Sequence, residues 1–319
     1  MIKVESLCKR FGAKTVVNDV SFSVERGEVL GFLGPNGAGK STTMRIITGY
    51  YPPTSGRVTI GGFDIMEKPI EAKRLMGYLP ENAPGYADMT VHGFLTFMAE
   101  LRGLKGDARK KAVQHAVALC SLGNVLYQTI DTLSKGYKHR TCLAQALVHD
   151  PQVLIMDEPT DGLDPNQKHE VRSLIRRMAS NKAIIFSTHI LEEVEETCSR
   201  AIIIDRGCIV ANGTPAELKA RSDMAGAVHV QTTGVASAAL LEHLNGVAGV
   251  VRAEVIFDTN GRVEARAYPD RNNRNLHLTR EIAELAARQH WQLDEIHTET
   301  GRLDEVFRAI TLPDTVKAA

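Results

Sequence analysis

The 319-residue sequence is long enough for one large or two medium domains, and its 43% hydrophobic content is ordinary for a folded protein. Its 38 basic and 38 acidic residues balance, so no general positive field favours nucleic acid as a partner. No apolar run is long enough to span a bilayer, no signal-peptide core follows Met1, and the five cysteines form no C-x-x-C pair, which predicts reduced cytosolic thiols.

The N-terminal segment alternates apolar and polar residues. Ile2–Leu7 and Val20–Glu25 each place their apolar groups on one face, which predicts antiparallel strands. Phe11, before Gly12, is either an aromatic platform for a purine ring or a half-buried aromatic of the sheet, and its spacing leaves both open. Val29–Leu33 is a continuous apolar run, typical of a strand buried on both faces.

The residues after this strand match the phosphate-binding pattern G-x-x-x-x-G-K-[ST]. Glycines let backbone N–H groups turn inward around a phosphate, and the start of the helix that follows adds partial positive charge. Lys40 is predicted to reach the β and γ phosphates, and the Ser41 hydroxyl to ligate Mg²⁺. The alternative is a glycine-rich turn before an ordinary helix. The predicted nucleotide-binding residues are Gly34, Pro35, Asn36, Gly37, Ala38, Gly39, Lys40, Ser41 and Thr42.

A strand and several helices are predicted in the centre of the chain. Gly77–Asn82 is predicted to be a strand that ends in a loop, and apolar residues recur at helical spacing from Thr90 to about Gly123. Leu133–Tyr137 opens another helix, for which Ser134 is a natural N-cap.

Val153–Glu158 is an apolar strand that ends in two acids, at the place where open α/β sheets bind their ligands. Asp157 is predicted to hold Mg²⁺, and Glu158 to orient or deprotonate an attacking water. A strand that merely stops at a charged turn is the alternative, and it explains one acid better than two. The absence of a guanine-specificity motif favours ATP. A further buried strand, Ala183–Ser187, leads to His189.

Composition shifts near Arg221, and the pattern beyond it is close to a strand–helix–strand–strand–helix–strand order. This order predicts a small ferredoxin-like α+β domain for regulation or partner contact. His290, Trp291 and His297 are expected to lack companions at a useful spacing. Residues 313–319 are expected to be a frayed tail.

The order of these motifs resembles the nucleotide-binding subunit of an ATP-binding cassette (ABC) transporter, over residues 1 to about 217. Leu133–Tyr137 resembles the signature Leu-Ser-Gly-Gly-Gln, and Pro159–Pro165 resembles the loop after the Asp-Glu strand. The resemblance implies an α/β P-loop NTPase fold with a RecA-like mixed sheet core, an antiparallel β subdomain and a helical subdomain. The implied domains are the cassette at 1–220, with its helical subdomain at about 82–150, the accessory domain at 221–312 and the tail at 313–319.

The resemblance also assigns roles to single residues. Phe11 falls on the aromatic that stacks on adenine, and His189 on the switch histidine that holds the γ-phosphate and water. Glu158 falls on the catalytic base. Ser134 and Gly136 of a second cassette would donate to the γ-phosphate, with a helix dipole behind them.

Two departures from the family pattern concern the site. Glu81 stands where Gln is usual, so a carboxylate in place of an amide would contact Mg²⁺ or water. Lys135 and Tyr137 stand where Gly and Gln are common, while Ser134 and Gly136 are kept. With the appended domain, these departures resemble the type-2 ABC export branch, which includes cassettes for gliding-type machinery, nitrous-oxide-reductase maturation and drug or polysaccharide export.

The implied function is an ATP-hydrolysing subunit that dimerises on ATP and drives a separate permease, as an exporter. The implied partners are a type-2 permease and a second cassette, with peripheral attachment to the inner face of the cell membrane and no nucleic acid. Both halves of a composite site are present in this one sequence, which favours a homodimer, and a heterodimer is the alternative. The alternative is a non-transport ABC ATPase that acts on nucleic acid or ribosomes. Such proteins usually carry two cassettes or long insertions, and this sequence shows one cassette, no heptad arm and no basic stripe. The sequence does not identify the cargo.

Overall fold

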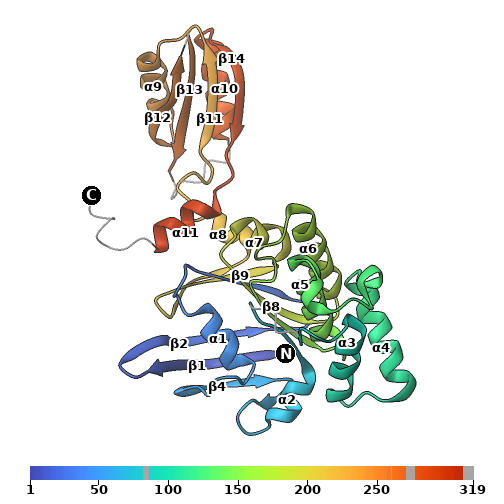
Figure 1. Ribbon diagram of the computed structural model, residues 1–319. Coiled ribbons are helices and arrows are strands. Elements are labelled where there is room, and N and C mark those ends of the chain that lie inside the picture. The colour runs from blue at the N-terminus through green and yellow to red at the C-terminus, as the bar shows by residue number, and fades with distance from the viewer. Residues whose placement is uncertain (82–85, 260, 271–276, 312–319) are drawn as a thin grey trace. The chain divides into compact units, whose positions relative to one another are not determined.

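The computed structural model describes residues 1–81, 86–259, 261–270 and 277–311. The chain forms two compact units, Met1–Pro215 and Ala216–Ala319 (Figure 1). Residues 82–85, where the helical subdomain is expected to begin, and the expected tail at 313–319 lie outside the described residues.

A six-stranded sheet runs through the first unit, in the order β10-β9-β3-β8-β7-β6. Its neighbouring strands are parallel except for β9 and β10, which form an antiparallel hairpin. The mixed sheet expected from the sequence is therefore confirmed. Its strands are β3 (Val29–Leu33), β6 (Met76–Leu79), β7 (Val153–Asp157), β8 (Ala183–Thr188), β9 (Arg200–Asp205) and β10 (Cys208–Gly213).

An antiparallel sheet in the order β2-β1-β4-β5 forms the second layer of this unit. Buried residues largely alternate along β1 and β2, as the sequence predicts. The sequence does not predict β5, because two residues carry no periodicity. The strands are β1 (Ile2–Phe11), β2 (Lys14–Val24), β4 (Ser55–Ile60) and β5 (Phe63–Asp64).

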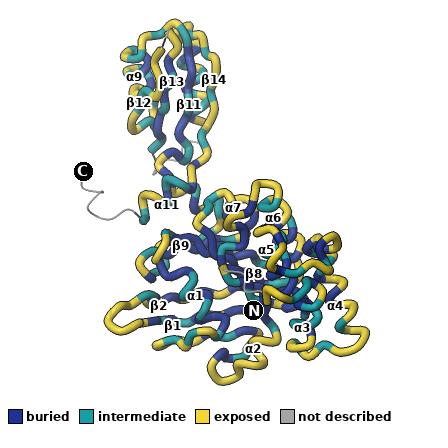
Figure 2. The backbone as a smooth tube through the Cα atoms, in the orientation of Figure 1, coloured by how far each residue is buried: buried dark blue, intermediate teal, exposed yellow. Residues whose placement is uncertain are grey.

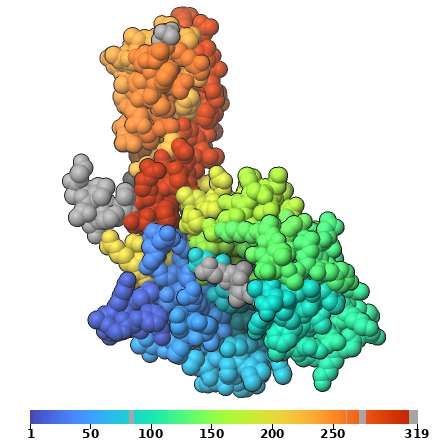
Figure 3. All heavy atoms as spheres, in the orientation of Figure 1, coloured from blue at the N-terminus to red at the C-terminus, as the bar shows by residue number. Residues whose placement is uncertain are grey.

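Several helices of the first unit begin at a side-chain cap. Thr90, Ser134 and Asp164 each accept a hydrogen bond from the backbone N–H three residues later. The side chains between residues 90 and 150, cyan to green in Figure 3, gather at one side of the unit. The helices are α1 (Lys40–Ile47), α2 (Pro69–Leu75), α3 (Val91–Leu101), α4 (Gly106–Leu119), α5 (Lys135–Leu147), α6 (Pro165–Ala179), α7 (Leu191–Thr197) and, at its end, α8 (Pro215–Lys219).

Both faces of the six-stranded sheet are buried, because alternate residues of its strands enter different cores (Figure 2). Phe32 and Ile155 belong to the core shared with the antiparallel sheet. Met156 and Phe186 belong to the core shared with α3, α4 and α5. Burial on both faces explains why these strands are continuous apolar runs in the sequence.

The second unit has a four-stranded antiparallel sheet in the order β12-β13-β11-β14. Two helices lie in the chain between its strands in the predicted order, so the ferredoxin-like arrangement is confirmed. Within the described ranges, no helix of either unit is long and apolar enough to cross a membrane. The elements are β11 (Val228–Thr233), α9 (Ser237–Asn245), β12 (Val250–Thr259), β13 (Arg262–Pro269), α10 (Leu278–Arg288), β14 (Gln292–Thr298) and α11 (Leu303–Thr311).

The core beneath the nucleotide loop can be tested with Phe32→Ala. Phe32 is 0% exposed, so its truncation leaves a cavity and should lower the free energy of unfolding by about 3–5 kcal/mol. Scanning calorimetry of the full chain measures the effect. The control is Tyr127→Ala, because Tyr127 is 78% exposed and its loss should change stability by less than about 0.5 kcal/mol. Equal stability of the two variants would contradict the assigned core.

Candidate functional site

The phosphate-binding loop joins β3 to α1, and two of its glycines have no room for a side chain. A Cβ on Gly34 would meet the carbonyl oxygen of Ile204. Gly39 has a φ of +107°, and a Cβ there would lie 2.7 Å from the carbonyl oxygen of Val16. Only glycine fits both positions, which explains the spacing of the motif.

Lys40, the first residue of α1, lies folded over its own loop. Its Nζ donates to the carbonyl oxygens of Gly34 at 2.8 Å and Pro35 at 3.3 Å, and the side chain is only 6% exposed. Burial lowers the pKa of Lys40, while the carboxylates of Glu158 and Asp157 oppose that shift. The loop therefore holds a buried cation whose counter-charges come from the end of β7.

Asp157, the last residue of β7, is 1% exposed and faces α1. Its Oδ1 accepts hydrogen bonds from Ser41 Oγ, at 3.1 Å, and from Ser187 Oγ. Its Oδ2 is buried and has no hydrogen-bond partner among the described residues. A buried carboxylate oxygen without a donor, beside a serine hydroxyl, is a donor set that fits Mg²⁺.

Glu158 follows directly and has a left-handed backbone conformation, with φ at +51°. Such a conformation is rare for a non-glycine residue and is concentrated at functional sites. Its Oε2 lies 2.9 Å from His189 Nδ1, and its Oε1 lies 3.8 Å from Lys40 Nζ. Burial raises the pKa of Glu158, whereas His189 and Lys40 act in the opposite direction.

A cavity of about 380 Å³ joins most of these groups. Glu81 lines this cavity. A carboxylate therefore lies at the site where the family usually has the amide of a glutamine. The residues that line the cavity are Lys14, Val16, Asn36, Gly37, Gly39, Lys40, Ser41, Thr42, Glu81 and Glu158.

Phe11 is not among the residues that line this cavity. Its ring is 45% exposed, packs edge-on against Tyr51 with centroids 5.6 Å apart, and has Lys9 Nζ 5.0 Å from its centroid. An exposed aromatic ring at the end of β1 is available to stack on a base.

The signature residues also lie outside the lining of the cavity. Ser134 caps α5, and Gly136 follows in its first turn, where a Cβ would lie 2.5 Å from the side chain of Gln167. Lys135 is 70% exposed and lies 3.8 Å from Asp161. The signature residues of a chain therefore do not line the nucleotide cavity of the same chain.

Comparisons with known proteins agree with this geometry. Residues 17–161 match the protein family described as ABC transporter. The chain is 37% identical to the linearmycin resistance ATP-binding protein LnrL of Bacillus subtilis (strain 168), over 98% of both chains. The chain belongs to the ATP-binding proteins of ABC transporters. A Nod factor export ATP-binding protein I of Burkholderia lata is 38% identical over 65% of this chain and 68% of that protein.

Solved structures confirm the cassette fold. An ATP-binding subunit of an ABC transporter has a TM-score of 0.64 at 30% identity and covers 69% of this chain and 92% of its own. A dimeric bacterial ABC transporter cassette has a TM-score of 0.63 at 21% identity and covers 67% of this chain and 99% of its own, which shows the fold alone. ABC cassettes bind and hydrolyse ATP, dimerise, and pair with membrane permeases. This chain is thus an ATPase subunit of an ABC transporter.

The structure adds Glu193 of α7, which the sequence analysis did not single out. Glu193 is 1% exposed and accepts hydrogen bonds from Thr160 Oγ1 and, at 2.8 Å, from Thr188 Oγ1. Its carboxylate therefore ties the loop after β7 to the end of β8, and Glu158 and His189 lie beside these two segments. The signal was available, because helical spacing places Glu193 on the same face as the buried Val194 and Thr197.

Glu193→Ala removes the carboxylate that joins the loop after β7 to the end of β8, and it should therefore lower ATP turnover. Two buried hydroxyls would lose their acceptor, which should cost about 1–3 kcal/mol of stability. The KM for ATP should change little, because the phosphate-binding loop is untouched. Steady-state ATPase kinetics measure both parameters, with Glu192→Ala at the exposed neighbouring position as the control. Wild-type turnover in Glu193→Ala would show that the connection has no role.

Turnover should also depend on the ionisation of Glu158. A general base works only when it is ionised, and burial raises the pKa of Glu158. The acidic limb of the pH profile of kcat should therefore lie at a pH above the usual pKa range of a glutamate. Because its pKa is raised on folding, the folded state binds the proton of Glu158 more tightly than the unfolded chain does. The contribution of Glu158 to folding stability therefore falls as the pH rises from the usual range of a glutamate through the folded-state pKa. His189→Gln removes a group that lowers this pKa, so it should move the limb to higher pH. If the acidic limb of the kcat profile lies at the same pH in His189→Gln as in wild type, the assignment of Glu158 as the base is contradicted.

Proposed function

We propose that this cassette binds ATP with Mg²⁺, hydrolyses it in a closed homodimer with Glu158 as the base, and powers export through a separate type-2 permease. The observation that carries the proposal is the convergence of Lys40, Asp157, Glu158 and His189 at one end of the parallel sheet. Each group comes from a different position of the P-loop NTPase pattern. Lys40 and His189 both contact Glu158, and Asp157 accepts a hydrogen bond from Ser41, the residue after Lys40.

The side chains have distinct roles in this proposal. Lys40 and the backbone N–H groups of residues 34–39 bind the phosphates. Ser41 and Asp157, with Glu81 at the rim, hold Mg²⁺, which when bound neutralises phosphate charge. Glu158 accepts the proton of the attacking water. His189 contacts Glu158 and would hold the γ-phosphate and that water from the same side.

The second half of the site comes from another copy in this proposal. One loop leaves the γ-phosphate open on one side, and Ser134 with the Gly136 amide would close it from the second cassette. Phe11 would stack on the adenine ring. Because one sequence carries both the loop and the signature, two identical chains form two complete sites.

A second cavity supports coupling to a permease. It measures about 820 Å³, and its aromatic wall includes Tyr50 and Tyr86, which are 70% and 57% exposed. Glu81 lines both this cavity and the nucleotide cavity. A cytoplasmic segment of the permease seated here would therefore contact the residue that lies beside the nucleotide, and the cassette would act at the inner face of the cell membrane. Relatives named for linearmycin resistance and Nod factor export favour the export direction.

Glu158→Gln tests the base and the dimer together. The variant should bind ATP as wild type does, hydrolyse it at least about 100-fold more slowly, and accumulate as an ATP-bound dimer. Turnover and light-scattering mass with and without ATP are the measurements, and Glu71→Gln, at an exposed position of α2, is the matched control. Near-normal turnover in Glu158→Gln would refute the base, and a monomer with bound ATP would refute the dimer.

A further inference from the structure

One face of the sheet in the second unit carries a group of polar side chains that the ATPase function does not use. Val228 and Val230 of β11 enter the core with residues of α9 and α10. Because side chains alternate along a strand, His229 and Gln231 lie on the opposite face. This face is separate from the core and holds ionisable groups from neighbouring strands.

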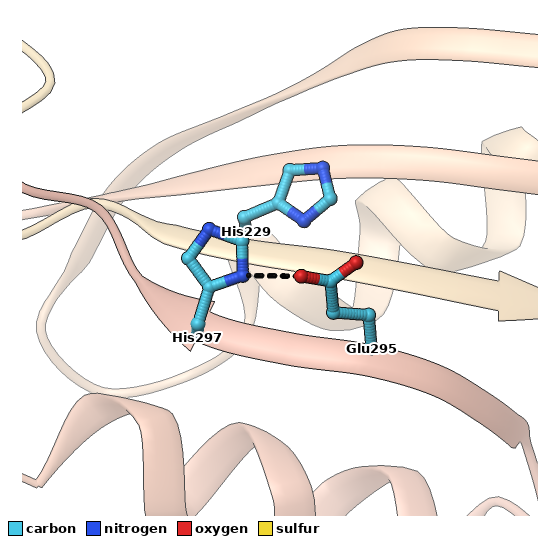
Figure 4. A group of neighbouring side chains, drawn as sticks. All are labelled: His229, Glu295 and His297. Carbon is cyan, nitrogen blue, oxygen red and sulfur yellow. Dashed lines mark ion pairs between the residues drawn. The ribbon is translucent and has the colours of Figure 1, made fainter.

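The register of β11 and β14 brings two histidines together on this face. His229 pairs with His297, and Gln231 pairs with Glu295 two residues away on the same side. The imidazole rings are stacked, with centroids 4.9 Å apart and planes at 27°. His297 Nδ1 lies 3.0 Å from Glu295 Oε1 (Figure 4). The expectation that His297 lacks companions is therefore wrong, since its companions come from strand pairing across the sheet.

The three side chains offer converging metal-ligand atoms. One ligand atom of each of His229, Glu295 and His297 lies within 4.8 Å of the others. In Figure 4 a ring nitrogen of His229 points toward the Glu295 carboxylate. Glu295 and His297 are about half exposed, at 54% and 48%, so small side-chain rotations can close the set around an ion.

His229 is more constrained than the other two. Its side chain is 13% exposed, and its Nδ1 is buried without a hydrogen-bond partner in the described part of the chain. A buried imidazole nitrogen without a partner calls for an explanation, and a bound cation supplies one. On the other side of the ring, Nε2 lies 3.8 Å from Glu264 Oε2. This carboxylate lies, at ion-pair rather than hydrogen-bond distance, on the side where the orienting partner of a metal-ligating histidine is usually found.

We propose that His229, Glu295 and His297 form a binding site for Zn²⁺ on the open sheet face of the second unit. Two imidazoles and one carboxylate suit zinc, whereas Mg²⁺ prefers oxygen ligands and retains its waters. Three protein ligands leave a fourth position of the tetrahedron for water or for a ligand from a partner. Because β14 is the edge strand of the sheet, coordination fastens it to β11. The site is independent of the proposed ATPase cycle.

The competing explanation is a cross-strand group of imidazole–carboxylate contacts without any ion. Zinc titration of the full chain under reducing conditions, against a chromophoric chelator and with Mg²⁺ in excess, separates the two. The double variant His229→Gln/His297→Gln should lose one equivalent of zinc that wild type binds. Glu295→Gln, which keeps both imidazoles and changes an exposed residue, should bind zinc at least about tenfold more weakly.

The control variant is His290→Asn. His290 is exposed outside the cluster and has a φ of +55°, a conformation that asparagine tolerates. It should keep the wild-type zinc stoichiometry and affinity. Circular dichroism confirms that each variant is folded, and Co²⁺ in place of zinc should give the visible absorption of a tetrahedral site in wild type but not in the double variant. Equal zinc binding by wild type and the double variant, or no saturable binding by wild type, would overturn the proposal.

Discussion

A lysine and two carboxylates lie together, largely shielded from solvent, where parallel strands of one sheet end, and the rest of the cassette depends on that pairing. Lys40 begins the helix after β3, Asp157 ends β7 and Glu158 follows it, and β8 lies between these two strands. A charge buried alone is strongly unfavourable, so each of these groups requires the others in place. The doubly covered sheet supplies the dry environment, and the strand order supplies the proximity. The buried Asp157 oxygen, which has no donor in the described part of the chain, can accept a cation.

Two features connect this charged group to the remainder of the first unit. Glu193 joins the loop after β7 to the end of β8, so the positions of the proposed base, Glu158, and of His189 are set together. Glu81 lines the nucleotide cavity and the aromatic cavity proposed for the permease. In the proposed cycle, the phosphate-binding loop is one half of a site, and the signature of a second copy is the other half. Binding of ATP and formation of the dimer are then one event.

The sequence predicts the features that local patterns encode. The strand at Val29–Leu33, the loop that follows it and the ferredoxin-like order of the second unit match the structure because apolar periodicity and motif spacing determine them. Contacts between distant segments are not encoded in this way. The hydrogen bond of Thr160 with Glu193 spans 33 positions, and the pairing of His229 with His297 depends on strand register. Neither could be read from spacing along the chain.

The composite nature of the ATP site is the central claim, and mixing two inactive variants tests it most directly. Lys40→Ala lacks a working loop and Ser134→Ala lacks a working signature, so a mixed dimer contains one intact site. ATPase activity of the mixture should lie well above the sum of the separate variants. Lys40→Ala mixed with the double variant Lys40→Ala/Ser134→Ala provides the background, because that pair forms no intact site. Activity equal to the simple sum would show that each chain's site is complete in itself.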